Sequence, residues 1–191
     1  VSLAPAAVID CRCALRWVYS HASEYGFDLK KLVVSGGSAG GHLSLTTGML
    51  DPSWGFDNEC REGRPDMKLP VAAIVNFYGI TDVADLLEGP NQKPYAVRWL
   101  SHMPDRKEIA RRVSPMQYVR PGLPPILTIH GDADPTVPYA HATMLHKALD
   151  AKKVPNELMT IPGGKHGNFT PDEYRQINKR IVEFLTKHKI L

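Results

Sequence analysis

The sequence lacks any apolar run that approaches the 18 or more consecutive residues of a membrane-spanning helix. Its basic pairs, such as Lys30-Lys31 and Arg111-Arg112, are scattered and not interleaved with aromatic residues, so a net charge of +3 gives little support for nucleic-acid binding. It contains no internal repeat and no low-complexity tract. What remains is a globular chain of 191 residues, 43% hydrophobic, which is enough for one substantial core.

Cysteine is also scarce. The chain has only three cysteines, and none stands at metal-ligand spacing. Cys11 and Cys13 lie two positions apart on a predicted helix and point in different directions, and Cys60 falls in a polar loop. We interpret all three as free thiols, which agrees with a reducing compartment and slightly favours the cytoplasm. No metal and no organic cofactor is predicted.

The most informative segment is 32–43, where an apolar strand enters a glycine-rich turn that leads into a helix. Gly36, Ser38 and Gly40 fill a G-x-S-x-G frame in this turn. Strand, tight turn and helix are the context of a nucleophile elbow, which exposes the serine hydroxyl at a strained corner. Glycines leave room where the strand and the helix cross. We expect the backbone N–H of Ala39, at the start of the helix, to face a developing oxyanion.

Two further strand ends carry the partners that a serine nucleophile needs. A strand at 126–130 leads into a loop with Asp132 and Asp134, and a strand at 158–161 leads into the glycine-rich loop that holds His166. Serine, aspartate and histidine thus follow three strands in the chain order of α/β-hydrolases. In such a triad the histidine takes the serine proton and the acid orients the imidazole. Asp132 and Asp134 remain rivals for the role of the acid.

Strands alternate with helical patterns along the chain, which indicates an α/β fold with a mostly parallel sheet flanked by helices. The predicted strands are 32–34, 71–78, 126–130 and 158–161, and the predicted helices are 4–25, 43–50, 139–152 and 171–188. We expect Pro5 in the first turn of the first helix. Thr170 and Glu173 form the signature of a capping box at the last helix.

Two long connections differ in where they leave the sheet. The segment 51–70 runs from a helix into a strand, so we place it at the N-terminal edge of the sheet and assign it no chemistry. The segment at about 80–124 leaves the C-terminal end of a strand, where open α/β sheets bind ligands. We predict a partly helical, cap-like insertion there. Trp99 within it, together with Gly37 and Tyr78, is predicted to bind substrate.

Three other polar residues near these motifs are given structural roles. His42 falls one turn into the helix after the elbow, and His130 ends a predicted strand. Asp82 follows the strand at 71–78 and is predicted to cap a turn. We expect structural hydrogen bonds from all three, with His130 near the site, rather than a part in proton transfer.

Three motifs carry a resemblance to α/β-hydrolases of the esterase and lipase kind, near the carbohydrate-esterase and hormone-sensitive-lipase-like groups. They are GGSAGGHL at 36–43, HGDADPTVP at 130–138 and GKHG at 164–167. The resemblance covers residues 5–170 and implies a serine carboxylesterase acting through an acyl-enzyme, with Ser38, Asp134 and His166 as the triad. It also implies short acyl esters as substrates, with acetyl or feruloyl groups on carbohydrates as first candidates, and no cofactor.

One departure from this family pattern concerns the oxyanion site. Relatives carry a His-Gly-Gly-type loop upstream of the elbow, and no such motif precedes Ser38. We interpret residues 1–191 as a single, partial catalytic domain that lacks its N-terminal strands, so a dimer or a separate N-terminal chain could complete the fold. Two alternatives stay open: a serine peptidase resembling acylaminoacyl- and dipeptidyl-peptidases, and a catalytically incompetent binding protein or fragment with a hydrolase fold.

Overall fold

The structure is a computed structural model that describes residues 2–61, 63 and 66–191. Residues 1, 62, 64 and 65, which belong to the predicted domain 1–191 and in part to the connection 51–70, lie outside the described residues. Within these ranges, four parallel strands form one sheet in the order β1-β2-β3-β4. They are β1 (Val33–Gly37), β2 (Ala73–Phe77), β3 (Ile126–Gly131) and β4 (Asn156–Ile161). The predicted parallel α/β fold is therefore confirmed.

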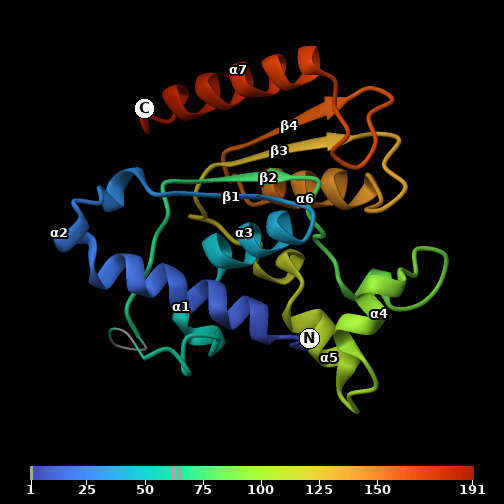
Figure 1. Cartoon of the computed structure of the whole chain (residues 1–191), viewed down its shortest axis with the longest axis horizontal. Helices are drawn as coiled ribbons and strands as arrows, with labels where there is room; N and C mark the ends of the chain where they lie inside the picture. Colours follow the sequence, from blue (N-terminus) through green and yellow to red (C-terminus); the bar gives the residue numbers. More distant parts are fainter. Residues whose placement is uncertain (1, 62, 64–65) are drawn as a thin grey trace.

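Helices cover both faces of this sheet (Figure 1). They are α1 (Ala6–Ser20), α2 (Ala22–Tyr25), α3 (Ala39–Met49), α4 (Pro94–Leu100), α5 (Arg106–Arg112), α6 (Ala140–Ala151) and α7 (Pro171–Lys187). In Figure 1, α7 lies on one side of the sheet and α1 and α3 lie on the other. The predicted capping box opens α7, because the Thr170 hydroxyl accepts the Glu173 N–H and the Glu173 carboxylate accepts the Thr170 N–H.

Alternation along the strands divides the apolar side chains between two cores. Ile126 of β3 packs with α3 and α6, whereas Leu127 and Ile129 pack with α7 through residues such as Phe184. A strand that is buried on both faces has to be almost continuously apolar, which is why these runs could be recognised from the sequence. Because all strands are parallel, their carboxyl ends meet at one edge of the sheet, and the loops at that edge share one site.

The N-terminal helical segment differs from the prediction of one helix over 4–25. The chain leaves the helical path at His21, so α1 and α2 are separate. The Trp17 carbonyl accepts the His21 backbone N–H, and His21 Nδ1 lies 2.9 Å from the same oxygen, so side chain and backbone compete for one acceptor. Pro5 precedes α1 as its N-cap and does not lie in its first turn. Gly26, in the left-handed region at φ 68°, ends α2.

The interpretation of the cysteines is wrong for two of the three. Cys13 of α1 and Cys60 of the 51–70 connection form a disulfide, and Cys11 is a free thiol. The bond joins positions 47 residues apart, a pairing that depends on how the connection folds back against α1 and that cysteine spacing does not reveal. Since disulfides belong mainly to oxidising environments, the cysteines no longer favour a reducing compartment.

The 51–70 connection is also held to α1 by a buried ion pair. The two Asp57 carboxylate oxygens accept from Arg12 Nε at 3.0 Å and from Arg12 Nη2 at 2.7 Å, and both side chains are almost fully buried. Arg16 adds a second guanidinium, with Nη2 at 3.5 Å from Asp57 Oδ1. Such a bidentate pair fixes the relative orientation of the two side chains and also pairs their opposite charges. A connection to which we assigned no chemistry thus has a structural role.

Residues 80–124 connect β2 to β3 and contain the short helical turns Ala84–Leu86 and Pro115–Tyr118 besides α4 and α5. They lie beside the carboxyl ends of the strands, on the same side of the sheet as α3 (Figure 1). Asp82 caps the first turn of this segment, since its Oδ1 accepts the N–H groups of Ala84 and Asp85. No helix in the described part of the chain is both long and apolar enough to cross a bilayer.

Candidate active site

Ser38 lies at the junction of β1 and α3 with φ 57° and ψ −117°. A non-glycine residue at such a positive φ is strained, and strain of this kind concentrates at functional sites. Gly36 makes the turn possible, because a Cβ at that position would overlap the carbonyl oxygen of Gly40. Ala39 is the first residue of α3, so its backbone N–H has no acceptor within the helix. The expected geometry of the elbow is present.

His166 lies between Ser38 and Asp134 and contacts both. Its Nε2 is 2.8 Å from Ser38 Oγ, and its Nδ1 is 2.7 Å from Asp134 Oδ2. A carboxylate can only accept, so the Nδ1 atom carries the imidazole proton and donates it to Asp134. The Nε2 atom is then free to accept the Ser38 hydroxyl proton. The Asp134 side chain is fully buried, whereas the His166 side chain is 21% exposed and reaches the surface of the site.

Geometry separates the two rival aspartates. Asp134 points its Oδ2 at His166, and its Oδ1 accepts the backbone N–H groups of Thr136 at 2.7 Å and Val137 at 3.1 Å. Asp132 turns away, and its Oδ1 accepts the Gly163 N–H at 2.6 Å. Asp132 therefore ties the loop after β3 to the loop after β4. Asp134 is the carboxylate that contacts the imidazole of His166.

The same two loops approach each other closely at a pair of glycines. A Cβ at Gly131 would overlap the carbonyl oxygen of Gly164, and that oxygen accepts the Ala133 N–H at 3.1 Å. Gly163 and Gly167, on either side of His166, both lie in the left-handed region. This close approach holds the acid loop and the histidine loop in register, and neither loop could carry larger residues at these points.

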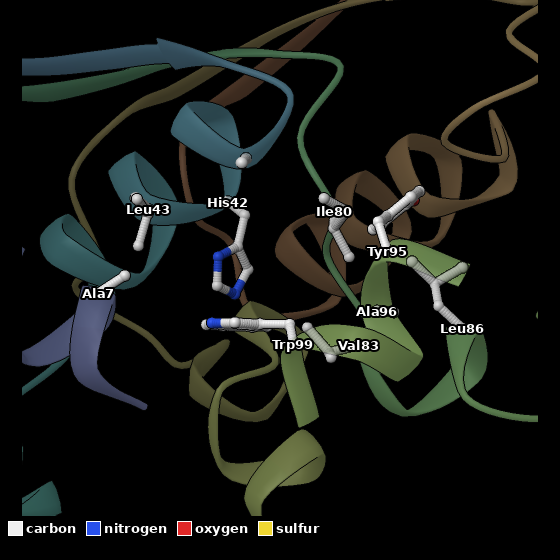
Figure 2. Close-up of a pocket in the computed structure, with 10 residues that line it drawn as sticks. Ala7, His42, Leu43, Ile80, Val83, Leu86, Tyr95, Ala96 and Trp99 are labelled. Atoms are coloured by element: carbon white, nitrogen blue, oxygen red, sulfur yellow. The ribbon is translucent and has the colours of Figure 1, made fainter. Parts of the chain in front are cut away.

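An apolar cavity of about 250 Å³ opens beside the elbow (Figure 2). It is lined by Ala7, Ala39, His42, Leu43, Ile80, Val83, Leu86, Tyr95, Ala96 and Trp99. Figure 2 shows His42 extending from α3 toward Trp99 on α4. The two rings pack edge to face, with their centroids 5.5 Å apart. The 80–124 segment thus provides one wall of the cavity. Ala39, the residue that follows Ser38, also lines the cavity, which therefore lies beside the elbow.

The cavity carries no charge at neutral pH. His42 is its one imidazole, and burial lowers the pKa of His42 to about 4. The His42 Nε2 atom lies 2.6 Å from the Val113 carbonyl oxygen, so it carries the proton and donates to the backbone, a structural hydrogen bond of the predicted kind. Tyr95 directs its hydroxyl away to the Thr136 carbonyl oxygen at 3.1 Å, and burial with the nearby Asp134 charge raises its pKa to about 12. Such a lining suits an uncharged group.

The three residues that we predicted to bind substrate do not lie together. Trp99 lines the apolar cavity, but Tyr78 is not among the lining residues, and its ring centroid lies 4.7 Å from that of His166. Gly37 belongs with Tyr78, because a Cβ at Gly37 would lie 3.0 Å from the Tyr78 hydroxyl. Burial raises the pKa of Tyr78, and the charges of Tyr174 and Asp134 add to that effect. Tyr78 therefore contacts the imidazole ring of His166, and its part in substrate binding stays a prediction.

Most of the cavity lining was missed by sequence reasoning. Ile80, Leu86 and Ala96 have no property that separates them from ordinary core residues, and only their place in the segment after β2 could have pointed to them. His130, which we predicted to form hydrogen bonds near the site, has its Nε2 atom 3.2 Å from Asp134 Oδ2, and the sequence did not reveal that partner. Within the described ranges, no group of three or more His, Cys, Asp or Glu side chains could hold a metal ion.

A family model described as BD-FAE matches residues 1–149, more than three quarters of the chain. The matched stretch includes Ser38 and Asp134 and ends before His166. The chain belongs to the BD-FAE family. This match, together with the esterase relatives and the solved esterase described next, confirms the resemblance to esterases of the α/β-hydrolase fold that was first seen in three short motifs.

Relatives of this BD-FAE family member include esterases and an acylamino-acid-releasing enzyme. The probable carboxylic ester hydrolase LipM of Mycobacterium tuberculosis is 34% identical over 167 residues, which are 85% of this chain and 38% of LipM. The acylamino-acid-releasing enzyme of Mus musculus is 28% identical over 144 residues, 75% of this chain and 18% of the enzyme. The chain spans about two fifths of the length of the curated esterases that it matches.

A solved esterase contains the architecture of this chain as part of its own. The propionate-bound esterase Est2 of Thermogutta terrifontis has a TM-score of 0.78 and 32% sequence identity to this chain. The similarity covers 100% of this chain and 68% of Est2. This agreement over every described element confirms the α/β-hydrolase fold of the BD-FAE family member.

Proposed function

We propose that this BD-FAE family member is a serine carboxylesterase in which Ser38, His166 and Asp134 carry the chemistry. The supporting observation is the unbroken hydrogen-bond chain from Ser38 Oγ through both imidazole nitrogens to a buried carboxylate, with distances of 2.8 and 2.7 Å. Nucleophile, base and orienting acid within hydrogen-bond reach are the signature of nucleophilic catalysis. The esterase names of LipM and Est2 favour an ester as the bond that is cleaved.

The proposed reaction uses these three side chains in turn. Ser38 Oγ attacks the ester carbonyl carbon while His166 Nε2 takes the hydroxyl proton, and Asp134 stabilises the imidazolium that forms. The tetrahedral oxyanion accepts a hydrogen bond from the Ala39 N–H at the positive end of α3. The carbon–oxygen bond to the alcohol then breaks, and the imidazolium returns its proton to the leaving oxygen. Water repeats the sequence on the acyl-enzyme and releases the acid.

The apolar cavity supports a short acyl group as the part of the substrate that is buried. Pockets for drug-sized ligands measure roughly 300–1,000 Å³, so about 250 Å³ beside Ser38 suits an acetyl to butyryl chain. Est2 has been solved with propionate and with butyrate bound, which agrees with this size. Acetyl or feruloyl groups on carbohydrates remain our first candidates for natural substrates, since the motifs resemble those of carbohydrate esterases.

The experiment that tests the proposal labels the chain with a fluorophosphonate and maps the adduct by mass spectrometry. We expect one adduct on Ser38, absent from Ser38→Ala and retained by the matched control Ser35→Ala, which alters an exposed serine of the preceding strand β1. Hydrolysis of p-nitrophenyl acetate, butyrate and octanoate then tests the acyl preference. A folded chain that gives no Ser38 adduct would refute the proposal and favour a hydrolase-fold binding protein.

One observation favours a second candidate, an acylaminoacyl-peptidase-like serine peptidase. The relative in Mus musculus is an acylamino-acid-releasing enzyme, and its similarity covers 75% of this chain. Both activities would use the same triad, with His166 protonating an amine instead of an alcohol. Parallel assays with N-acetylalanine p-nitroanilide and p-nitrophenyl acetate separate them. A larger kcat/KM for the anilide would favour the peptidase.

A further inference from the structure

A second imidazole contacts the acid of the triad. His130 is the fifth residue of β3, and its side chain is fully buried. Its Nε2 atom lies 3.2 Å from Asp134 Oδ2, the same oxygen that His166 Nδ1 contacts at 2.7 Å. One carboxylate oxygen is thus shared by two histidines that come from different strand ends.

The contacts of His130 determine its tautomer. Its Nε2 atom also lies 3.2 Å from the Val137 carbonyl oxygen. The carbonyl and the ionised Asp134 can only accept, so the Nε2 atom carries the proton and is shared between the two oxygens. The Nδ1 atom is buried and has no hydrogen-bond partner among the residues that the structure describes. A second proton there would lack an acceptor, so the ring stays neutral, and burial lowers the pKa of His130 accordingly.

This arrangement surrounds the Asp134 carboxylate with donors. Its Oδ1 accepts the N–H groups of Thr136 and Val137, and its Oδ2 accepts from His130 and His166. A carboxylate that accepts two hydrogen bonds on each oxygen cannot rotate freely about its bond to the side chain, and its negative charge is shared between the two oxygens. The direction in which Oδ2 faces His166 is then set before any substrate binds.

We propose that His130 is a positioning residue of the triad, whose Nε2–H holds the Asp134 carboxylate in the orientation that His166 requires. The proposal rests on the proposed esterase function. Besides Asp134 and His166, the titratable groups that face His130 are the phenols of Tyr139 and Tyr78, whose rings lie 5.7 and 6.5 Å away. Neither phenol has a hydrogen bond to His130, whereas Asp134 accepts one, so the carboxylate is the group through which His130 acts.

Removing the His130 donor has two expected consequences. Asp134 gains freedom to rotate, which lowers kcat by roughly ten- to a hundred-fold, the range for losing a hydrogen bond to a charged group. The negative charge left on Oδ2 then stabilises protonated His166 more strongly, so the acidic limb of the kcat/KM profile moves to higher pH. KM should change little, because His130 lies outside the cavity that would hold the acyl group.

The test compares His130→Leu, His130→Gln and His130→Asn in the full chain. The Gln amide reaches the place of Nε2 and should recover most of kcat and the wild-type pH profile, whereas the shorter Asn amide should not. His146→Leu is the matched control: His146 is another buried imidazole with one unpartnered nitrogen, and it contacts Asn156 at the start of β4. We expect it to lower the melting temperature and leave the profile in place.

The readouts are kcat, KM and their pH dependence with p-nitrophenyl acetate, and the downfield proton resonance of the His166 Nδ1–H···Asp134 hydrogen bond. If His130→Leu does not fold, the Gln and Asn variants carry the comparison. A folded His130→Leu variant with wild-type kcat and an unchanged acidic limb of the kcat/KM profile overturns the proposal. A loss of kcat that is proportional to the loss of melting temperature in all variants, the His146→Leu control included, overturns it as well. If the wild type fails to label at Ser38, the proposed function fails separately, and the proton resonance alone decides whether His130 positions Asp134.

Discussion

Replacing Asp134 by Asn is expected to abolish most of the activity through a tautomer change. The Asp134 Oδ1 atom accepts two backbone N–H groups, so the amide oxygen of Asn has to occupy that place. The amide nitrogen then takes the place of Oδ2 and donates toward His166 Nδ1. That contact requires the proton of His166 to move to Nε2, where it faces Ser38 Oγ and prevents the imidazole from accepting the hydroxyl proton.

The expected magnitude is a drop in kcat of about 10⁴, the size known for this exchange in a serine protease triad, which corresponds to roughly 5 kcal/mol of transition-state stabilisation. The assay is steady-state hydrolysis of p-nitrophenyl acetate, with a melting curve for each variant. Asp132→Asn is the matched control, because its amide oxygen still accepts the Gly163 N–H and activity should stay within a few-fold of the wild type. A variant Asp134→Asn that keeps a tenth of the wild-type kcat, or a larger loss at Asp132, would refute the reasoning.

Three further predictions concern the cavity, the disulfide and a buried histidine. Trp99→Ala enlarges the cavity and should shift the ratio of octanoate to acetate hydrolysis toward octanoate by about ten-fold. Reduction of the Cys13–Cys60 bond, which closes a loop across 47 positions, should lower the free energy of unfolding by about 4 kcal/mol in denaturant titrations. Since burial lowers the pKa of His42 to about 4 from an unfolded value of 6.5, the unfolded chain binds more protons. Stability should therefore fall by about 3 kcal/mol between pH 6.5 and 4.

Each of these predictions has a control in the chain. Trp54→Ala changes a half-exposed tryptophan outside the cavity and should leave the acyl preference unaltered. Cys11→Ser should make no difference to the effect of a reductant, because Cys11 is outside the disulfide. The acid-induced loss should shrink in His42→Gln, and an equal loss in that variant would contradict the assignment to His42.

Several parts of the fold and the site could be predicted because their signals are local. The strand, the glycines around Ser38 and the following helix are neighbours in the chain, and the backbone conformation of the elbow demands those small residues. The capping box of Thr170 and Glu173 spans one helical turn. Parallel strands bring their carboxyl ends to one edge, which is why the order of motifs could place Asp134 and His166 near the serine.

Other parts depend on contacts between segments that are distant in the sequence. The choice of Asp134 over Asp132 follows from where the Gly163 loop crosses the loop after β3, and the Cys13–Cys60 bond follows from how the 51–70 connection returns to α1. The second donor to the acid, His130, acquires its meaning only when the loop after β3 turns back over its own strand end. The sequence by itself determined the four strands, the elbow and the residue types of the proposed site, because these obey local backbone and periodicity rules. Only the tertiary structure decided which side chains meet, because that depends on long-range packing. The path of the loop after β3, for example, decides that Asp134 and not Asp132 contacts His166.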